Sequence, residues 1–78
     1  SDIERFMDKE RLDGLLGLMS EKERNVLGAR FGLGDSKPKT LAEISETMKV
    51  SRERVRQIEE AALKKLKQLV LEQDKEKL

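Results

Sequence analysis

The chain has 78 residues, which is enough for one domain with a small hydrophobic core. It contains neither cysteine nor histidine, the side chains that most zinc sites and general-base catalysts use, so we predict no enzyme, no metal and no other cofactor. The formal net charge is only +1, and the apolar runs are too short for a membrane span or a signal peptide, so we predict a cytoplasmic protein without a membrane partner.

The first predicted helix lies in the N-terminal third of the chain. Apolar residues between Ile3 and Met19 recur at three- and four-residue steps, a spacing typical of an amphipathic helix. We expect an interruption near Gly14 and an end at Gly17. Because this pattern starts almost at Ser1, without a Met, we interpret the chain as part of a longer protein.

A second helix is predicted to begin after Ser20. Ser20 and Glu23 have the spacing of a capping box, in which each side chain accepts from the backbone N–H of the other. We expect this helix to stop at Gly32, and to turn three apolar residues toward the core: Val26, Leu27 and Phe31. Residues 32–39 then form a loop, since they hold two glycines and the only proline of the chain.

Two further helices are predicted, with a short break between them. Thr40 and Glu43 form a second capping box, and one face of the helix they start is apolar: Leu41, Ile44 and Met48. After the break, Ser51 is a fresh N-cap, and apolar residues at three- and four-residue steps predict a helix of about five turns. The predicted fold is therefore all-α, a small bundle of four to five helices.

The spacing of these last two helices is that of a helix-turn-helix. The motif needs a small residue where the helices approach, which Ser45 supplies, and an apolar residue in the turn that plugs into the core, which we assign to Val50. Lys49 follows the first helix, where we expect a left-handed residue at a cost of about 1 kcal/mol. The predicted organisation is one domain, 1–78, with N-terminal helices in 1–31, a loop in 32–39, the helix-turn-helix with its recognition helix in 40–70, and a charged tail that frays in 71–78.

The second helix of the motif presents a polar face. With Val55 turned inward, a rotation of 100° per residue places five side chains outward: Glu53, Arg56, Gln57, Glu60 and Lys64. Arg52 lies at the flank, near the helix start. An Arg can grip guanine, a Gln adenine and a Glu the cytosine amino group. We therefore predict four residues that read bases in a major groove: Arg52, Glu53, Arg56 and Gln57.

The local charge of the helix-turn-helix segment favours an anionic partner, although the net charge of the whole chain is low. The segment 49–67 has seven basic residues against three acidic ones. A plainer interpretation of the polar face is a solvated surface crossed by i,i+4 ion pairs, such as Glu60 with Lys64. The helix-turn-helix pattern favours DNA recognition over that interpretation. Arg54 points sideways, and we favour a structural bridge from it to Glu43 or Glu46.

Several segments together resemble a known family. The segments are Arg30-Phe31-Gly32-Leu33, Thr40-Leu41-x-Glu43-Ile44, Val50-Ser51-Arg52-Glu53-Arg54-Val55-Arg56-Gln57-Ile58-Glu59 and Ala62-Leu63-x-x-Leu66. They resemble the C-terminal promoter-binding domain, conserved region 4, of bacterial sigma factors of the housekeeping type. After the last helix such proteins usually carry an Arg-His-Pro-Ser stretch, whereas this chain has Lys67 to Glu72. The sequence therefore leaves open a primary or an alternative sigma factor.

The resemblance implies a role in transcription initiation, with promoter DNA and RNA polymerase as partners. The four predicted base-reading residues match those that read the promoter −35 element. Contacts to the DNA backbone are matched by Lys22, Arg30, Thr40 and Leu41. A patch that touches transcription activators is matched by Lys64, Lys65 and Lys67. Six residues match the surface with which the family binds the flap of the polymerase β subunit: Phe6, Leu15, Leu16, Leu18, Val26 and Leu27. Anti-sigma proteins use the same surface.

Two other functions fit parts of the sequence. One is a helix-turn-helix effector domain of another transcription regulator, which would work as a dimer. The capped helix that ends in Arg30-Phe31-Gly32 favours a sigma factor over this possibility. The other is a protein-interaction module that binds a polymerase or anti-sigma helix and never DNA. The Met- and Leu-rich N-terminal third suits such a module, although we expect most of those residues to be ordinary core.

Overall fold

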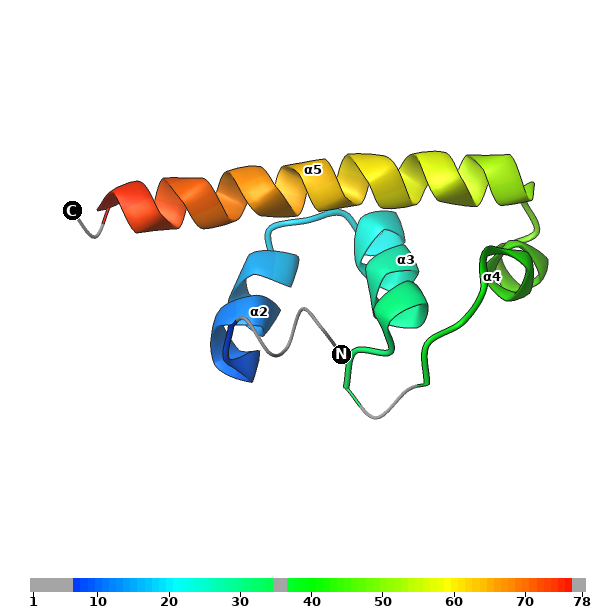
Figure 1. Cartoon of the computed structure of the whole chain (residues 1–78), viewed down its shortest axis with the longest axis horizontal. Coiled ribbons are helices and arrows are strands. Elements are labelled where there is room, and N and C mark those ends of the chain that lie inside the picture. The colour runs from blue at the N-terminus through cyan, green and yellow to red at the C-terminus, as the bar shows by residue number, and fades with distance from the viewer. Residues whose placement is uncertain (1–6, 35–36, 77–78) are drawn as a thin grey trace.

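The computed structural model describes residues 7–34 and 37–76, and these form four helices with no strand among them. The helices are α2 (Lys9–Leu16), α3 (Glu21–Phe31), α4 (Leu41–Met48) and α5 (Arg52–Glu76). Figure 1 shows α5 as a long rod, with the three shorter helices arranged along one side of it. The predicted all-α bundle with a helix-turn-helix is confirmed. Within these ranges no helix is long and apolar enough to cross a membrane.

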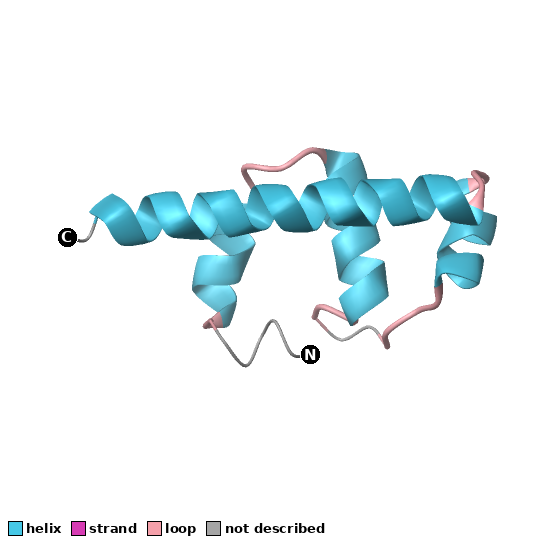
Figure 2. Cartoon of the chain, turned by 45° about the horizontal axis from the view of Figure 1, so that its top comes forward, coloured by secondary structure: helices cyan, strands magenta, loops and turns pink. Residues whose placement is uncertain are grey.

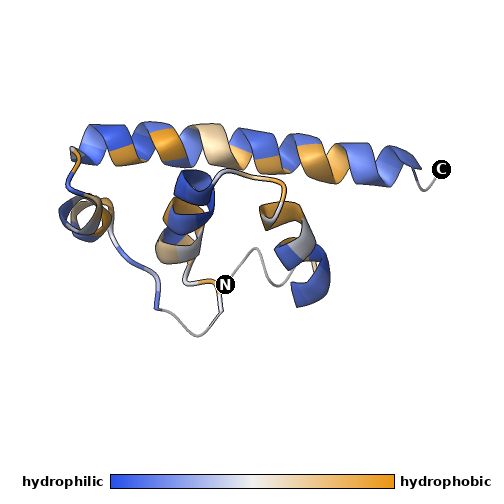
Figure 3. Ribbon diagram, turned by 180° about the vertical axis from the view of Figure 1, so that it is seen from behind, coloured by the Kyte–Doolittle hydropathy of each residue, from blue (hydrophilic) through white to orange (hydrophobic). Residues whose placement is uncertain are grey.

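The core consists of two clusters that share α3 and α5. One joins α2, α3 and α5 through Leu12, Leu15, Met19, Leu27, Ala62 and Leu66. The other joins α3, α4 and α5 through Val26, Ile44, Val55 and Ile58. Figure 3 shows the apolar bands of α5 on the side that faces the short helices, and a hydrophilic opposite side. The amphipathic pattern of α5 thus positions the three short helices and leaves its other face to solvent.

Local signals set most helix ends where the sequence predicts them. In both capping boxes the hydroxyl accepts from the N–H of the Glu, at 3.2 Å for Ser20 and 3.1 Å for Thr40. The Glu carboxylate in turn accepts from the capping residue's N–H, at 2.9 and 3.1 Å. Gly32 ends α3 with a left-handed φ of 63°. The interruption expected near Gly14 is absent from α2, which runs through that exposed position to its C-cap at Gly17.

In the turn between α4 and α5, Lys49 has the predicted conformation, whereas Val50 does not have the predicted burial. Lys49 is left-handed, with a φ of 59°, and the N–H of Val50 donates to the carbonyl of Ser45 at 3.2 Å. The Ser51 hydroxyl caps α5 by accepting from the N–H of Arg54 at 3.0 Å. Figure 2 shows this tight connection at one end of the molecule. Val50 is 37% exposed rather than plugged into the core, and the apolar cluster at this end consists of Val26, Ile44, Val55 and Ile58 without it.

The left-handed Lys49 gives a direct test of the turn. Glycine adopts this conformation without a Cβ penalty, so Lys49→Gly is expected to be neutral or to stabilise the domain by up to about 1 kcal/mol. Thermal melts followed by circular dichroism measure the difference. Lys49→Ala is the matched control, since it removes the side-chain charge and keeps the Cβ. A clear fall in the melting temperature of the glycine variant would show that Lys49 is not left-handed in solution.

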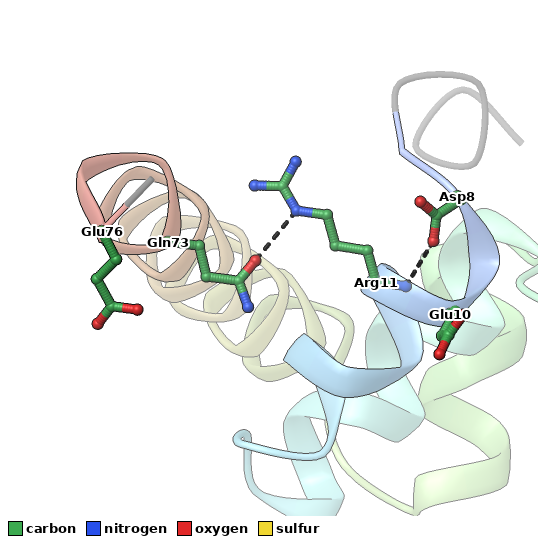
Figure 4. A pocket seen from close by; sticks show the side chains of 5 residues that line it. All are labelled: Asp8, Glu10, Arg11, Gln73 and Glu76. Atoms are coloured by element: carbon green, nitrogen blue, oxygen red, sulfur yellow. Dashed lines mark hydrogen bonds between the residues drawn. The ribbon is translucent and has the colours of Figure 1, made fainter. Parts of the chain in front are cut away.

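The last helix is longer than the sequence predicts. It has 25 residues, about seven turns rather than five, so residues 71–76 are helical and not a frayed tail. A side chain of α2, near the other end of the chain, contacts the additional turns of α5. The Arg11 guanidinium donates to Gln73 at 3.0 Å and pairs with Asp74 at 2.8 Å. Figure 4 shows Arg11 reaching from α2 to the Gln73 side chain on α5.

Candidate nucleic-acid interface

The first three turns of α5 present a polar face supported by a buried one. Val55 and Ile58 are 0% and 6% exposed and anchor the helix in the core. The four residues predicted to read bases are all exposed: Arg52, Glu53, Arg56 and Gln57. Because the helix is fixed by its apolar side and by the Ser51 cap, these side chains project from a rigid support. The structure therefore brings the predicted reading set together on one accessible face.

Arg56 lies at the centre of an ionic cluster on this face. Its Nε donates to both carboxylate oxygens of Glu53, at 3.1 and 3.0 Å, and its Nη2 donates to Glu53 Oε1 at 2.6 Å. Its Nη1 donates to Glu60 Oε2 at 2.8 Å. The hydrogen bonds with Glu53 raise the pKa of Arg56, and those with Arg56 lower the pKa of Glu53. Both groups are therefore charged at neutral pH, with a carboxylate on either side of the arginine.

The residues expected to contact the DNA backbone lie on α3 and at the start of α4. Lys22 is exposed in the first turn of α3, Thr40 is exposed as the N-cap of α4, and Leu41 is half-buried beside it. The N-terminus of a helix carries a partial positive charge, which favours a nearby phosphate. Thr40 thus combines a capping role within the protein with a position suited to an anionic ligand.

Arg30 is the exception, because much of its guanidinium is engaged inside the domain. Its Nε pairs with Glu59 at 3.2 Å, and its Nη1 donates to the carbonyl of Lys39 at 3.1 Å. The N–H of Lys39 also donates to the carbonyl of Ala29 at 2.9 Å. Arg30 therefore ties α3 to α5 and to the segment that leads into α4. Any contact with a phosphate would have to use the remaining donors of this planar group.

The three lysines of the predicted activator patch differ in their surroundings. Lys65 pairs with Glu23 at 3.4 Å, and the same carboxylate belongs to the capping box of α3. The backbone hydrogen bond from Ser20 is the largest cause of the lowered pKa of Glu23, and Lys65 adds to it. Lys64 and Lys67 are exposed. Lys65 thus has a structural partner, while the other two are open to an acidic surface.

The predicted polymerase-contact surface needs correction, since half of its residues form the core. Leu15, Val26 and Leu27 are 0% exposed, so their side chains cannot line a docking surface in this structure. A domain of this size must bury its best-placed aliphatic residues to be stable. Leu16 is half-buried and Leu18 is exposed. The sixth residue, Phe6, lies outside the described residues.

Neither of the two ion pairs that the sequence suggests for the helix-turn-helix is present among the described residues. Over residues 7–34 and 37–76, no ion pair joins Arg54 to Glu43 or Glu46, and Arg54 is exposed. Glu60 pairs with Arg56, four residues before it, and not with Lys64. Arg56 and Lys64 are both four residues from Glu60, so spacing alone cannot predict which of them pairs with it. The planar guanidinium of Arg56, already oriented by Glu53, decides the pairing.

Comparison with known proteins gives a consistent result over most of the chain. The sequence model of the family described as "Sigma-70, region 4" matches residues 15–68. RNA polymerase sigma factor SigA1 of Synechococcus elongatus is 46% identical over 66 residues, which cover 85% of this chain and 16% of that protein. SigA of a Bacillus species is 49% identical over 59 residues, 76% of this chain and 16% of that protein. SigA of Lactococcus lactis subsp. cremoris is 44% identical over 63 residues, with coverages of 81% and 17%. The chain therefore spans about one-sixth of the length of these relatives.

Proposed function

This chain belongs to the sigma-70 region 4 family, and from that premise we propose that its helix-turn-helix recognises the −35 element of bacterial promoters as part of a sigma factor. The observation that supports this most is the exposed set of Arg52, Glu53, Arg56 and Gln57 on the first turns of α5. The proposed role is recognition for transcription initiation and not catalysis. It places the chain in the cytoplasm, where promoter DNA and RNA polymerase meet.

In this proposal α5 enters the major groove with its N-terminal turns. The side chains there offer both donors and acceptors, which suit different base edges. Arginine donates to guanine, glutamine pairs with adenine, and glutamate accepts from the cytosine amino group. A face built only to bind phosphates would have no use for Glu53. α4 would cross the DNA backbone, as the first helix of such motifs does.

We further propose that RNA polymerase supplies much of the binding energy. The accessible apolar residues Leu16 and Leu18 suit a contact with the flap of the β subunit, and an anti-sigma factor would compete for the same place. The exposed Lys64 and Lys67 suit the acidic surface of an activator bound next to the promoter. Membership of the family favours this arrangement over a self-sufficient, dimeric regulator.

Arg56→Ala tests the base-reading role. The variant is expected to lose about 1–3 kcal/mol of discrimination at one base pair of the −35 element, because a bidentate pair with guanine is lost. Gel-shift titrations of the polymerase complex on a series of −35 variants measure this. Lys75→Ala is the control, since Lys75 is exposed on the same helix but in its last turn, far from the recognition turns. Equal weakening on all sequences would make Arg56 a phosphate contact instead.

A further inference from the structure

The ionic cluster around Arg56 leaves no edge of its guanidinium without a carboxylate. Nε and Nη2 face Glu53, at distances of 2.6 to 3.1 Å. Nη1 faces Glu60 at 2.8 Å. A guanidinium reads guanine by directing two donors at O6 and N7 together. Each pair of nitrogens that it would use for this includes at least one that already donates to Glu53 or Glu60.

The two carboxylates differ in what they do besides holding Arg56. Glu53 lies in the predicted reading set, one turn nearer the helix start, and grips the Nε edge through both of its oxygens. Glu60 lies one turn beyond Arg56 and its side chain is 72% exposed. In the part of the chain that the structure describes, Arg56 is the only residue with which Glu60 forms an ion pair. Release of Glu60 therefore breaks no other ion pair and frees Nη1, while Nη2 keeps its hydrogen bond to Glu53 and has a second N–H that can donate along the Nη1–Nη2 edge.

We propose that Glu60 is a positioning residue that competes with DNA for the Nη1 group of Arg56, and so lowers the affinity of the domain for its site. This inference rests on the function proposed above. In the free protein Glu60 and Glu53 hold the guanidinium along the surface of α5. In the complex Arg56 leaves Glu60, and part of the binding energy is used to break that pair.

The expected effect is modest and has a definite sign. Exposed ion pairs of this kind contribute little, so Glu60→Gln is expected to tighten binding of a −35 duplex by about two- to five-fold. Glutamine has nearly the helix propensity of glutamate and the same shape, so α5 is expected to keep its structure. Circular dichroism of the variant checks this. Glu72→Gln is a matched control, since Glu72 is exposed on α5 four turns from Arg56.

A double-mutant cycle separates competition for Arg56 from a general effect of charge. Fluorescence anisotropy would compare the chain, Glu60→Gln, Arg56→Ala and the double variant on the same −35 duplex and on an unrelated duplex. The proposal expects tighter binding by Glu60→Gln alone, and no gain from Glu60→Gln when Arg56 is already alanine. A gain that persists in the Arg56→Ala background would overturn it, because removal of a negative charge near phosphates would then explain the result.

The same measurements distinguish failure of this inference from failure of the proposed function. If Arg56→Ala reduces preference for the −35 duplex but Glu60→Gln binds like the unchanged chain, only the role of Glu60 is wrong. If the unchanged chain and Arg56→Ala bind both duplexes equally well, base reading by Arg56 is wrong and the inference falls with it.

Discussion

Replacing Leu27 by alanine is expected to destabilise the domain by about 2–5 kcal/mol, the range for a buried leucine cut back to alanine. Leu27 is 0% exposed and lies in the cluster that joins α3 to α2 and α5. The cavity would open where three helices meet, so few neighbours could move to fill it. Because small domains have a total stability of only about 5–15 kcal/mol, the variant is expected to be partly or fully unfolded at 37 °C. Urea titrations followed by circular dichroism measure the change.

Leu18→Ala is the control for this experiment. Leu18 is the same residue type and lies between α2 and α3, but it is 62% exposed, so its loss is expected to change stability by less than about 0.5 kcal/mol. The pair also tests the corrected polymerase surface. A Leu27→Ala protein of unchanged stability with weakened polymerase binding would mean that Leu27 is accessible after all, contrary to its position in the core.

Binding of the isolated chain to a −35 duplex is expected to be weak and strongly dependent on salt. The proposal puts five basic residues on or near the DNA side: Lys22, Arg30, Arg52, Arg56 and Lys64. Arg30 can add a phosphate contact only through the donors that Glu59 and Lys39 leave free, so we count four or five contacts. With four or five phosphates neutralised at about −0.9 each, the slope of log K against log salt is near −4. Raising the salt from about 50 to about 200 mM is then expected to weaken binding by roughly 10²-fold. Micromolar or weaker affinity at physiological salt follows, with RNA polymerase supplying the remainder.

Fluorescence-anisotropy titrations at several salt concentrations test this expectation. Lys22→Ala is expected to reduce the slope by about one unit, since one phosphate contact is lost. Lys75→Ala is the control, because Lys75 is exposed in the last turn of α5, far from the recognition turns. Nanomolar affinity with a flat response to salt would contradict the electrostatic argument. It would indicate a self-sufficient regulator, active as a dimer, instead of a domain that works within a larger complex.

The features that depend on residues a few positions apart could be predicted from the sequence. The capping boxes at Ser20 and Thr40, the left-handed Lys49 and the Ser51 cap are all where the spacing predicts them. Each is a contact within one or two turns, so the residue types and their order are sufficient to specify it. The outward face of α5 follows in the same way from helical periodicity, once Val55 is taken as buried.

The sequence could not predict which apolar residues form the core or which charged groups pair across the molecule, because both depend on how the helices pack. Leu15, Val26 and Leu27 are as apolar as Leu18, and their burial depends on helices that are distant in the chain. The ties from Arg11 to Asp74 and from Arg30 to Glu59 join residues 63 and 29 positions apart. No local pattern specifies such contacts, because they exist only once α5 brings the other helices together. For the same reason the sequence could place Arg56 on the recognition face, but the packed helix determined which carboxylates hold it there.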